Sequence, residues 1–533
     1  MDCTFTDLSY RDTGYFSTIV NAYIDNDKKL KPFIKYPVSP EGLTEAIEQR
    51  KKFPVDRKLL AAELLRQYKQ LDIAGRVEDN INLLLKENTF TVCTAHQPAI
   101  FTGNLFFIYK IVHAIKLAEK LQKQFPENNF VPVYYMGSED ADLDELGNIS
   151  MDGEKIIWET RQQGAIGRMN TKGLEMIIAR IEGELLVHPF GGELIDLLKE
   201  CYLNSPDIQT ATLKLVHHLF AGYGLVVLIP DNANLKRALV SVFEDELLNQ
   251  VSSAIVSKTV DNISKDFKVQ AHPRNINLFY LKDGIRERIE RKGDEWRVIN
   301  TDIVFGKTAI LKELNDNPER FSPNVILRGI LQEILLPDVA FIGGGGELAY
   351  WMELKELFEQ YNVFYPVLIV RNSFAVIEKK WKNKIDKLHL SIADIFKDEQ
   401  MLLNELVKRD SDKQLSLKKE IEGITYYYRQ LRTVAEQTDT TLGVHVEALR
   451  TKTIKPIETL EKKMLRAEKR KFYDQSRQLS AIKKALFPNK GLQERVDNFM
   501  PFYSQWGREF IKMIYEHSYS IEQRFGLLIV ESD

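Results

Sequence analysis

Short apolar segments alternate with amphipathic ones along much of the chain, and this alternation predicts an α/β fold. Residues 89–95, TFTVCTA, are β-branched and precede Pro98, as is typical of a buried strand. The next segment, NLFFIYKIVHAIKLAEKLQ, repeats apolar residues at helical spacing, and FVPVYYMG predicts a second strand. A strand, a helix and a strand in this order predict a parallel sheet with a right-handed crossover.

Two later apolar segments, 222–231 and 362–370, predict further strands of the same sheet. Between them, residues 265–320 alternate apolar and polar positions around Asp283-Gly284 and Gly293-Asp294, which are turn dipeptides of β-hairpins. The predicted order is an N-terminal helical lead-in over 1–88, core segments over 89–150, 222–264 and 321–373, a helical insertion over 151–221 and an antiparallel β insertion over 265–320.

The segment 374–485 is nearly free of glycine and proline and repeats Leu, Ile, Val and Met at helical spacing. Long helices that pair as an antiparallel coiled coil around the break TDTTLG are therefore predicted. Such an arm usually mediates dimerisation, while an ordinary helical domain with a solvated charged face is the alternative. Residues 486–533 end in RFGLLIV, which predicts a strand returning to the core.

Length and charge narrow the functional classes. The 533 residues exceed what one hydrophobic core normally supports, and a net charge of -3 gives no field that would attract nucleic acid or an anionic membrane. Cys3, Cys93 and Cys201 are too widely spaced for a disulfide framework or a zinc ribbon. No signal peptide or apolar run of ~20 residues is present, so we expect a cytoplasmic protein without a membrane anchor.

Loops at the carboxyl ends of parallel strands are the usual place for ligands. His96 and Gln97 follow the first predicted strand, and Thr102, Gly103 and Asn104 precede its helix. We expect Thr102 to cap that helix and the free N–H groups behind it to suit a phosphate. A purely structural role for the histidine and an ordinary helix start are the alternatives.

An acidic cluster follows the second predicted strand. Such carboxylates can coordinate Mg²⁺, bind an ammonium group, or act as a base where burial raises a pKa. A solvated acidic loop is equally open. The residues are Glu139, Asp140, Asp142, Asp144 and Glu145.

A glycine run precedes another helical pattern in GGGGELAYW. Glycines allow positive φ and close backbone approach, and an acid at a helix start suits the helix dipole. The spacing matches neither a dinucleotide fingerprint nor a P-loop, so a nucleotide or substrate loop and a flexible connection both stay open. Nearby polar residues either bind phosphate or carboxylate or serve as surface and capping residues. These candidates are Gly343, Gly344, Gly345, Gly346 and Glu347, with Asn324 and Arg328 before them and Arg371, Asn372 and Ser373 after the strand at 362–370.

Several long motifs together resemble one family, in the same order from about residue 90 to the C-terminus. They are TAHQPAIFTGNLFFIYKIVHAIKLAE, VPVYYMGSEDADLDELGNI, NLFYLKDGIRERI, FSPNVILRGILQEILLPDVAFIGGGGELAYWMELKELFE and LFPNKGLQERVDNFMPF. These segments resemble the cysteine-adding enzymes of bacillithiol biosynthesis, which are cysteine ligases.

The resemblance implies a Rossmann-like core with connecting-peptide insertions and a coiled-coil arm that pairs two protomers. It also implies that cysteine is joined through its carboxyl to the amine of glucosaminyl malate. The core is similar to nucleotidylyltransferases and class I aminoacyl-tRNA synthetases, so ATP or ADP is expected to bind and an acyl-adenylate to form. Where those enzymes have His-x-Gly-His, this chain has Phe101-Thr102-Gly103-Asn104, and Ala141 stands where many relatives have histidine.

The roles implied for the candidates divide into three groups, and Mg²⁺ is a further expected ligand. The rival hypotheses are a nucleotidylyltransferase or another ATP-dependent ligase acting on a different small carboxylate, and a non-catalytic coiled-coil scaffold.

All roles require that the helix start near 102, the acidic turn near 140 and the glycine run near 345 meet around one pocket. Asn104, Glu139, Asp140 and Asp144 are expected to be catalytic; His96, Gln97, Thr102, Gly103, Gly343, Gly344, Gly345, Gly346 and Glu347 to bind the nucleotide; and Glu145, Asn324, Arg328, Arg371, Asn372 and Ser373 to bind substrate.

Overall fold

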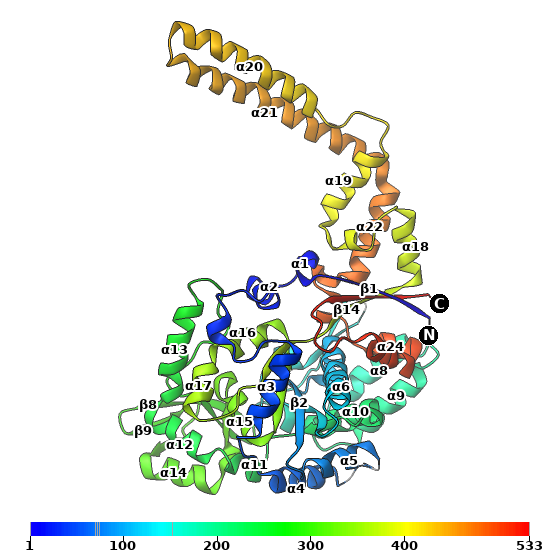
Figure 1. Ribbon diagram of the computed structural model, residues 1–533. Helices are drawn as coiled ribbons and strands as arrows, with labels where there is room; N and C mark the ends of the chain where they lie inside the picture. Colours follow the sequence, from blue (N-terminus) through cyan, green and yellow to red (C-terminus); the bar gives the residue numbers. More distant parts are fainter. Residues whose placement is uncertain (1, 70, 72, 74, 152, 532–533) are drawn as a thin grey trace. The chain divides into compact units, whose positions relative to one another are not determined.

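The computed structural model describes residues 2–69, 71, 73, 75–151 and 153–531 (Figure 1). The chain divides into two compact units. The first comprises Met1–Val376 with Gly491–Ser532, and the second comprises Ile377–Lys490.

The first unit is built on a five-stranded parallel sheet of order β13-β12-β2-β3-β6. The strands predicted from the apolar segments are confirmed, and β12 lies between β13 and β2. Helix α6, Phe106–Gln124, connects β2 to β3 and packs on both, while α3, Pro40–Arg50, packs on β12 and β13 (Figure 1). The strands are β2 (Thr89–His96), β3 (Asn129–Met136), β6 (Val226–Leu228), β12 (Asp338–Gly343) and β13 (Val367–Val370).

The main core lies between this sheet and its covering helices. Val92, Ile342 and Ile369 from three adjacent strands pack with Leu117 of α6 and Ile47 of α3, and each of these side chains is at most 1% exposed. Strands buried on both faces carry near-continuous apolar sequence, which explains why TFTVCTA does not alternate. The α/β fold class predicted from the sequence is therefore confirmed.

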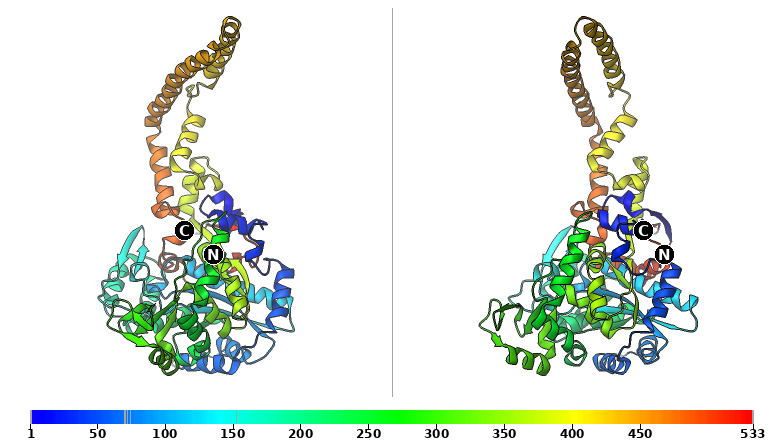
Figure 2. Two further views of the ribbon diagram at one scale, coloured as in Figure 1. Left: turned by 90° about the vertical axis from the view of Figure 1, so that its left-hand side faces the viewer. Right: turned by 60° about the vertical axis from the view of Figure 1, so that its left-hand side comes forward.

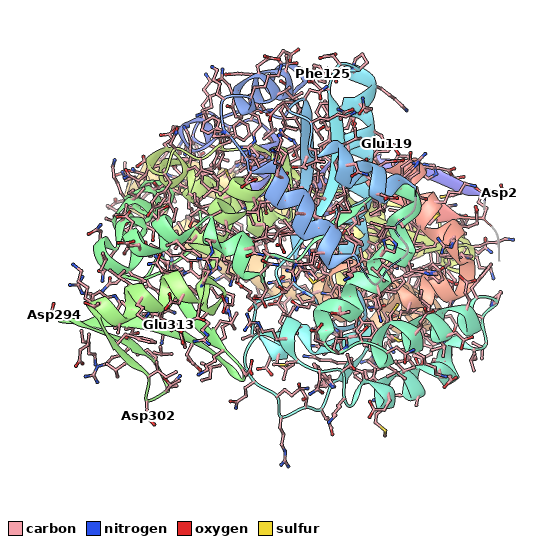
Figure 3. All side chains as sticks on the ribbon, turned by 90° about the horizontal axis from the view of Figure 1, so that it is seen from below. Asp2, Glu119, Phe125, Asp294, Asp302 and Glu313 are labelled. Carbon is pink, nitrogen blue, oxygen red and sulfur yellow. The ribbon has the colours of Figure 1, made fainter. Side chains whose placement is uncertain are left out.

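A second sheet is antiparallel, with strand order β10-β9-β8-β7-β11. The two predicted hairpins are confirmed, because Lys282 pairs with Ile285 and Lys292 with Glu295 across two-residue turns. Figure 3 shows Asp294 and Asp302 at the outer edge of this sheet. The strands are β7 (Leu278–Lys282), β8 (Ile285–Lys292), β9 (Glu295–Val298), β10 (Val304–Gly306) and β11 (Phe321–Pro323).

The remaining helices of the first unit surround the two sheets, and the segment predicted as a helical insertion opens with a short hairpin of β4 (Asn148–Met151) and β5 (Glu154–Ile157). Helix α7 (Leu143–Leu146) precedes this hairpin, and the helices after it are α8 (Leu174–Leu185), α9 (Gly191–Leu198), α10 (Ile208–Phe220), α11 (Ala233–Arg237), α12 (Val240–Asn249), α13 (Val251–Ile263), α14 (Lys307–Asp316), α15 (Val325–Leu335), α16 (Gly345–Glu353), α17 (Lys355–Gln360), α23 (Met500–Trp506) and α24 (Arg508–His517).

The N-terminal lead-in was predicted to be helical throughout, and this is wrong for its first residues. Strand β1, Cys3–Leu8, pairs antiparallel with β15, Phe525–Val530, in a sheet of order β1-β15-β14 that includes β14, Ser373–Glu378. A six-residue strand gives little pattern, and its partner lies at the other end of the sequence. The helices that follow are α1 (Tyr10–Thr13), α2 (Thr18–Ile24), α3, α4 (Arg57–Gln67) and α5 (Arg76–Leu83).

The second unit is helical, and its two longest helices run side by side (Figure 2). The Tyr428 hydroxyl lies 2.8 Å from Thr453 Oγ1, and the Leu417 N–H donates to Glu461 Oε1 at 3.0 Å, so the pair is antiparallel. This confirms the predicted coiled coil. No helix among the described residues is long and apolar enough to span a membrane. The helices are α18 (Lys379–Lys387), α19 (Glu399–Asp410), α20 (Lys418–Thr438), α21 (Leu442–Lys469) and α22 (Tyr473–Leu486).

Candidate functional site

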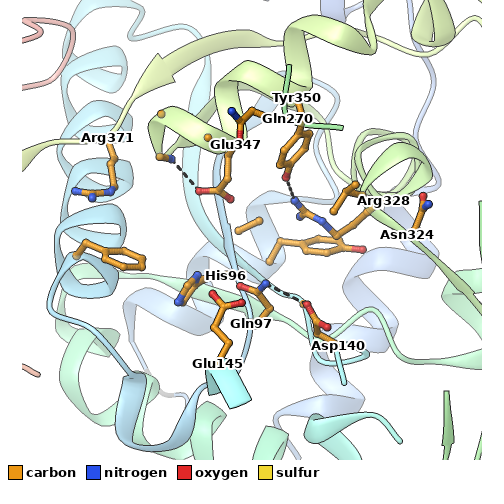
Figure 4. Close-up of a pocket in the computed structure, with 18 of the residues that line it drawn as sticks. His96, Gln97, Asp140, Glu145, Gln270, Asn324, Arg328, Glu347, Tyr350 and Arg371 are labelled. Atoms are coloured by element: carbon orange, nitrogen blue, oxygen red, sulfur yellow. Dashed lines mark hydrogen bonds between the residues drawn. The ribbon is translucent and has the colours of Figure 1, made fainter. Parts of the chain in front are cut away.

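A cavity of about 550 Å³ opens at the carboxyl edge of the parallel sheet (Figure 4). Residues at the ends of four strands line it. His96 is the last residue of β2 and Gln97 follows it, Glu139 follows β3, Gly344 follows β12, and Arg371 follows β13. Parallel strands end at one edge, which is why residues far apart in sequence meet here. A volume of this size fits one or two small metabolites.

Most of the predicted site residues line this cavity, and the acidic turn and the glycine run do meet. The helix start near residue 102 does not take part, and Phe106, one turn further on, lines the cavity instead. The predicted residues that line it are His96, Gln97, Glu139, Asp140, Glu145, Asn324, Arg328, Gly344, Gly345, Gly346, Glu347 and Arg371. Those outside its lining are Thr102, Gly103, Asn104, Asp144, Gly343, Asn372 and Ser373.

The prediction that Thr102 caps helix α6 is wrong. The helix begins at Phe106, its N-cap is Leu105, and no side chain caps it. Phe101, Thr102 and Gly103 instead have φ values of 48°, 71° and 66°, which is strained for the first two. This turn is held from outside, because Asn498 Nδ2 donates to the carbonyls of Phe101 at 2.9 Å and Gly103 at 2.5 Å.

The carboxylates of the acidic turn differ in their partners. Glu139 is buried and forms an ion pair with Lys236 of α11, a lysine that is fully buried. Burial raises the pKa of Glu139, while Lys236 acts in the opposite direction. Asp140 accepts hydrogen bonds from Gln97 Nε2 at 3.1 Å and from the Ala141 N–H at 2.7 Å. Both carboxylates are therefore already engaged by the protein.

Glu145 is the exception among the acids of the cavity. Its side chain makes no ion pair or hydrogen bond within the described part of the chain, and burial raises its pKa, with the charges of Asp142 and Asp140 adding to the effect. Asp142 caps the short helix α7 by accepting the Glu145 N–H at 3.1 Å, and both Asp144 and Glu145 are exposed to solvent. Glu145 thus has a free carboxylate, which is needed either to accept a proton or to bind an ammonium group of a ligand.

The glycine run does not adopt the conformation expected from its sequence. None of the four glycines has a positive φ. The run is instead needed for space, since a Cβ on Gly343 would lie 2.6 Å from Leu348 Cδ1 and one on Gly345 would lie 2.5 Å from Val20 Cγ2. Close packing against α2 and α16 therefore explains the small residues.

The start of helix α16 presents free donors to the cavity. The N–H groups of Gly345 and Gly346 have no acceptor among the described residues, as is usual for the first turn of a helix. The Glu347 carboxylate folds back, and its Oε2 accepts the Gly344 N–H at 2.8 Å and Lys110 Nζ at 2.5 Å. We call this segment, which consists of Gly344, Gly345, Gly346 and Glu347, the glycine turn.

The arginines of the cavity also differ in how freely they can bind an anion. Both terminal nitrogens of Arg371 bind Glu494, at 2.9 and 2.8 Å, and its guanidinium lies 4.8 Å from the Phe106 ring. Arg328 donates only one terminal nitrogen, Nη2, to the Tyr350 hydroxyl. Arg328 is therefore better placed to bind a substrate anion than Arg371.

Sequence reasoning missed two arginines, Arg286 and Arg495, that line the same cavity. Arg286 lies on β8 with its guanidinium 4.0 Å from the Phe279 ring and its Nη1 3.8 Å from Asp140 Oδ1. The hairpin pattern shows that Arg286 alternates with its neighbours, but it cannot show that one face of the hairpin meets the parallel sheet. No local signal could have identified either residue.

The remaining predicted residues have structural partners. Burial lowers the pKa of His96 well below its usual value, and its ring contacts Phe106 and Phe107 at centroid distances of 5.2 and 5.4 Å. Asn372 Nδ2 donates to the Tyr519 carbonyl, and Ser373 Oγ donates to Glu494. Within the described ranges, no group of three or more His, Cys, Asp or Glu side chains is arranged to hold a metal ion.

The different packing around two residues of the glycine turn predicts different effects of substituting them by alanine. Gly345→Ala places a methyl group against Val20 and should lower the free energy of unfolding by about 1–3 kcal/mol. Gly346→Ala meets nothing within 4 Å and should be neutral or stabilise by up to about 1 kcal/mol, because alanine favours the helix. Urea denaturation measures both, and equal effects would contradict the packing explanation.

Comparisons with known proteins give a consistent result. A family model described as "Bacillithiol biosynthesis BshC, N-terminal Rossmann-like domain" matches residues 1–372. A second, described as "Bacillithiol biosynthesis BshC, C-terminal coiled-coil domain", matches residues 374–530.

The chain is also similar to curated proteins named "Putative cysteine ligase BshC". The protein from Flavobacterium johnsoniae is 37% identical over 525 residues, covering 98% of this chain and 99% of the relative. The protein from Flavobacterium psychrophilum is 37% identical with 98% of both chains covered, and that from Cytophaga hutchinsonii is 37% identical with 93% of both covered. A solved structure described as a "putative arginyl t-RNA synthetase" from Campylobacter jejuni is 10% identical with a TM-score of 0.22, covering 80% of this chain and 92% of that one, a likeness too weak to support an argument.

Proposed function

Because the chain belongs to the BshC family of bacillithiol biosynthesis, we propose that it is a ligase that joins the carboxyl of cysteine to the amine of glucosaminyl malate, with ATP as the activating cosubstrate. One observation carries the proposal. A single cavity holds a carboxylate without a cation partner, Glu145, together with arginines that retain free donors. This arrangement suits a substrate that carries both an amine and carboxylates.

The amine of the sugar must lose a proton before it can attack a carboxyl carbon. Glu145 is the group we assign to this step, because its side chain faces the cavity unpaired and its pKa is raised by burial and by neighbouring acids. A carboxylate with a raised pKa is a stronger base at neutral pH than an ordinary one. Glu139, which is paired with Lys236, and Asp140, which accepts from Gln97, then shape the site rather than accept the proton.

The malate carboxylates require cationic partners, and we assign Arg328 and Arg286 to them. Arg328 projects from the second turn of α15, and its helix N-cap, Asn324, also lines the cavity. Arg286 Nε donates to Ser322 Oγ at 3.4 Å, and its Nη1 lies 3.8 Å from Asp140 Oδ1, which is too far for a hydrogen bond, so its terminal nitrogens can still donate to a ligand. Planar guanidinium groups bind carboxylates through two parallel hydrogen bonds, which gives both affinity and orientation.

The glycine turn fits the phosphate groups of ATP. The free N–H groups of Gly345 and Gly346 and the positive end of the α16 dipole face the cavity, and a Cβ position on Gly344 lies 3.8 Å from Arg371 Nε. When bound, ATP would supply the activation that makes the cysteine carboxyl reactive. A Mg²⁺ ion would need phosphate oxygens among its ligands, since no set of three protein ligands occurs in the described residues.

The direct test is product formation by the purified protein with cysteine, glucosaminyl malate and ATP, followed by mass spectrometry. We expect bacillithiol to form, and Arg328→Met to lower kcat/KM at least about 10-fold, as loss of a charged hydrogen bond predicts. Arg297→Met, on the exposed face of β9, is the matched control and should keep wild-type activity. Product from another carboxylate but not from cysteine would reject the assignment.

The base assignment predicts a shift in the pH profile of kcat/KM. Activity should fall as the pH drops through the pKa of Glu145, which lies above the ordinary value for glutamate. Asp142→Asn removes a neighbouring negative charge, lowers the pKa of Glu145 and should move the acidic limb towards lower pH. Asp144→Asn, outside the cavity lining, should leave the limb in place; a shift there instead would count against Glu145.

We also propose that two chains pair through the coiled coil. Eight large apolar side chains on α20 and α21 are exposed, which is typical of an uncovered interface. Val434→Glu should weaken a dimer in sedimentation equilibrium at least about 10-fold, whereas Thr433→Glu, at the adjacent polar position, should not; a monomeric wild type would rule the pairing out. The eight are Tyr426, Tyr427, Leu431, Val434, Leu442, Val444, Leu449 and Leu460.

A further inference from the structure

A lysine lies buried directly behind the glycine turn. Lys110 belongs to the second turn of α6, and its side chain is 1% exposed. Its Nζ donates to the Ala95 carbonyl at 2.5 Å and to Glu347 Oε2 at 2.5 Å. One ammonium group therefore joins the end of β2, helix α6 and the start of α16.

The burial of this lysine is unfavourable unless it is paired. A buried ammonium loses its hydration, and a protein retains it only where an opposite charge and hydrogen bonds replace the water. Burial lowers the pKa of Lys110, and the Glu347 carboxylate acts in the opposite direction. The pair thus depends on Glu347 staying in its folded-back position.

Glu347 would otherwise oppose the binding of an anion at the glycine turn. Its carboxylate follows directly after Gly345 and Gly346, whose N–H groups are the free donors, and the side chain is 24% exposed. A negative charge there repels phosphate or carboxylate in a site partly shielded from water. Glu347 lines the cavity, and its Oε2 accepts the Gly344 N–H at 2.8 Å and the Lys110 ammonium, so this charge is fixed in place and paired.

We infer that Lys110 is a positioning residue that neutralises Glu347 and fixes its carboxylate, so that the glycine turn can accept an anionic group of the substrate or cosubstrate. The inference rests on the proposed function only in taking an anion to bind at this turn. Lys110 does not line the cavity, so it acts through Glu347 and not by touching the ligand.

The inference predicts a specific pattern of binding constants. Lys110→Met leaves the Glu347 charge without its partner and should weaken the binding of inorganic pyrophosphate at least about 10-fold. Adding Glu347→Gln to that variant removes the repelling charge and should restore binding to within about 3-fold of wild type. Isothermal titration calorimetry measures the binding constants of both variants. EDTA is present so that no metal ion can bridge pyrophosphate and the Glu347 carboxylate.

The control is Lys116→Met, which removes a lysine from the same helix. Lys116 Nζ binds the Tyr515 carbonyl at 3.1 Å, well away from the glycine turn, so pyrophosphate binding should not change. In steady-state assays, Lys110→Met should raise the KM for ATP more than it lowers kcat, since chemistry at the carboxyl is remote from this lysine.

A second variant keeps the inference testable if Lys110→Met fails to fold. Glu347→Gln alone retains one acceptor oxygen, which can receive both the Lys110 ammonium and the Gly344 N–H as Oε2 does in the wild type, and should bind pyrophosphate at least as tightly as wild type. Loss of binding in this variant would show that the carboxylate itself helps to hold the anion and would overturn the inference. So would unchanged binding in Lys110→Met, or failure of the double variant to recover.

The outcome for the ligase proposal is separate. If wild type forms bacillithiol but does not bind pyrophosphate, the inference fails and the proposed reaction stands. If the pyrophosphate pattern appears but no bacillithiol forms, the role of Lys110 stands and the proposed reaction fails.

Discussion

The buried ion pair between Arg371 and Glu494 holds the candidate site together. Both side chains are almost fully buried, at 7% and 0% exposure, and burying two such charges costs several kcal/mol unless the pairing is complete. Here it is complete, because two parallel hydrogen bonds join the groups and Ser373 Oγ donates to the same carboxylate. The pair fixes the end of strand β13 to a segment that begins about 120 residues further along the chain.

That C-terminal segment has a second role. A few residues beyond Glu494, Asn498 supplies the two hydrogen bonds that hold the strained turn at Phe101–Gly103, and Arg495 lines the cavity. A strained backbone persists only where surrounding contacts over-determine it. The ion pair and Asn498 therefore act together. The ion pair fixes the position of the C-terminal segment, and Asn498 of that segment fixes the turn that leads into helix α6.

The same principle of pairing governs the charges around the cavity. Lys236 neutralises Glu139, Lys110 binds Glu347, and Glu494 neutralises Arg371. Arg286 Nη1 lies 3.8 Å from Asp140 Oδ1, so the charged groups of the cavity without an ion-pair partner among the described residues are Glu145, Arg328 and Arg495. The number of charged residues near the site is thus a poor guide to its chemistry, because most of them satisfy one another. A ligand interacts mainly with the charged side chains that have no ion-pair partner in the protein.

This explains which features could be predicted from the sequence. The strands β2 and β3 and helix α6 follow from local periodicity, and the hairpins follow from their turn dipeptides, because both signals lie within a few residues. The glycine run was located correctly, but its reason was not: Gly345 is small because Val20 packs against it. Strand β1, the pairing of Arg371 and the placement of Arg286 depend on contacts hundreds of residues apart, which no local pattern encodes.

The long-range contacts also explain why the helix start near residue 102, which was predicted from the sequence to suit a phosphate, lacks free donors. In this chain the Leu105 N–H donates to the Asp497 carbonyl at 2.7 Å, and Asn104 Nδ2 donates to the Arg495 carbonyl at 2.9 Å. Donors already bound to the protein cannot also bind phosphate. Helix α16 keeps the N–H groups of Gly345 and Gly346 free at the cavity. Of the two helix starts near the carboxyl edge of the sheet, that of α6 is therefore bound to the C-terminal segment of the chain, and that of α16 is the one with free N–H groups.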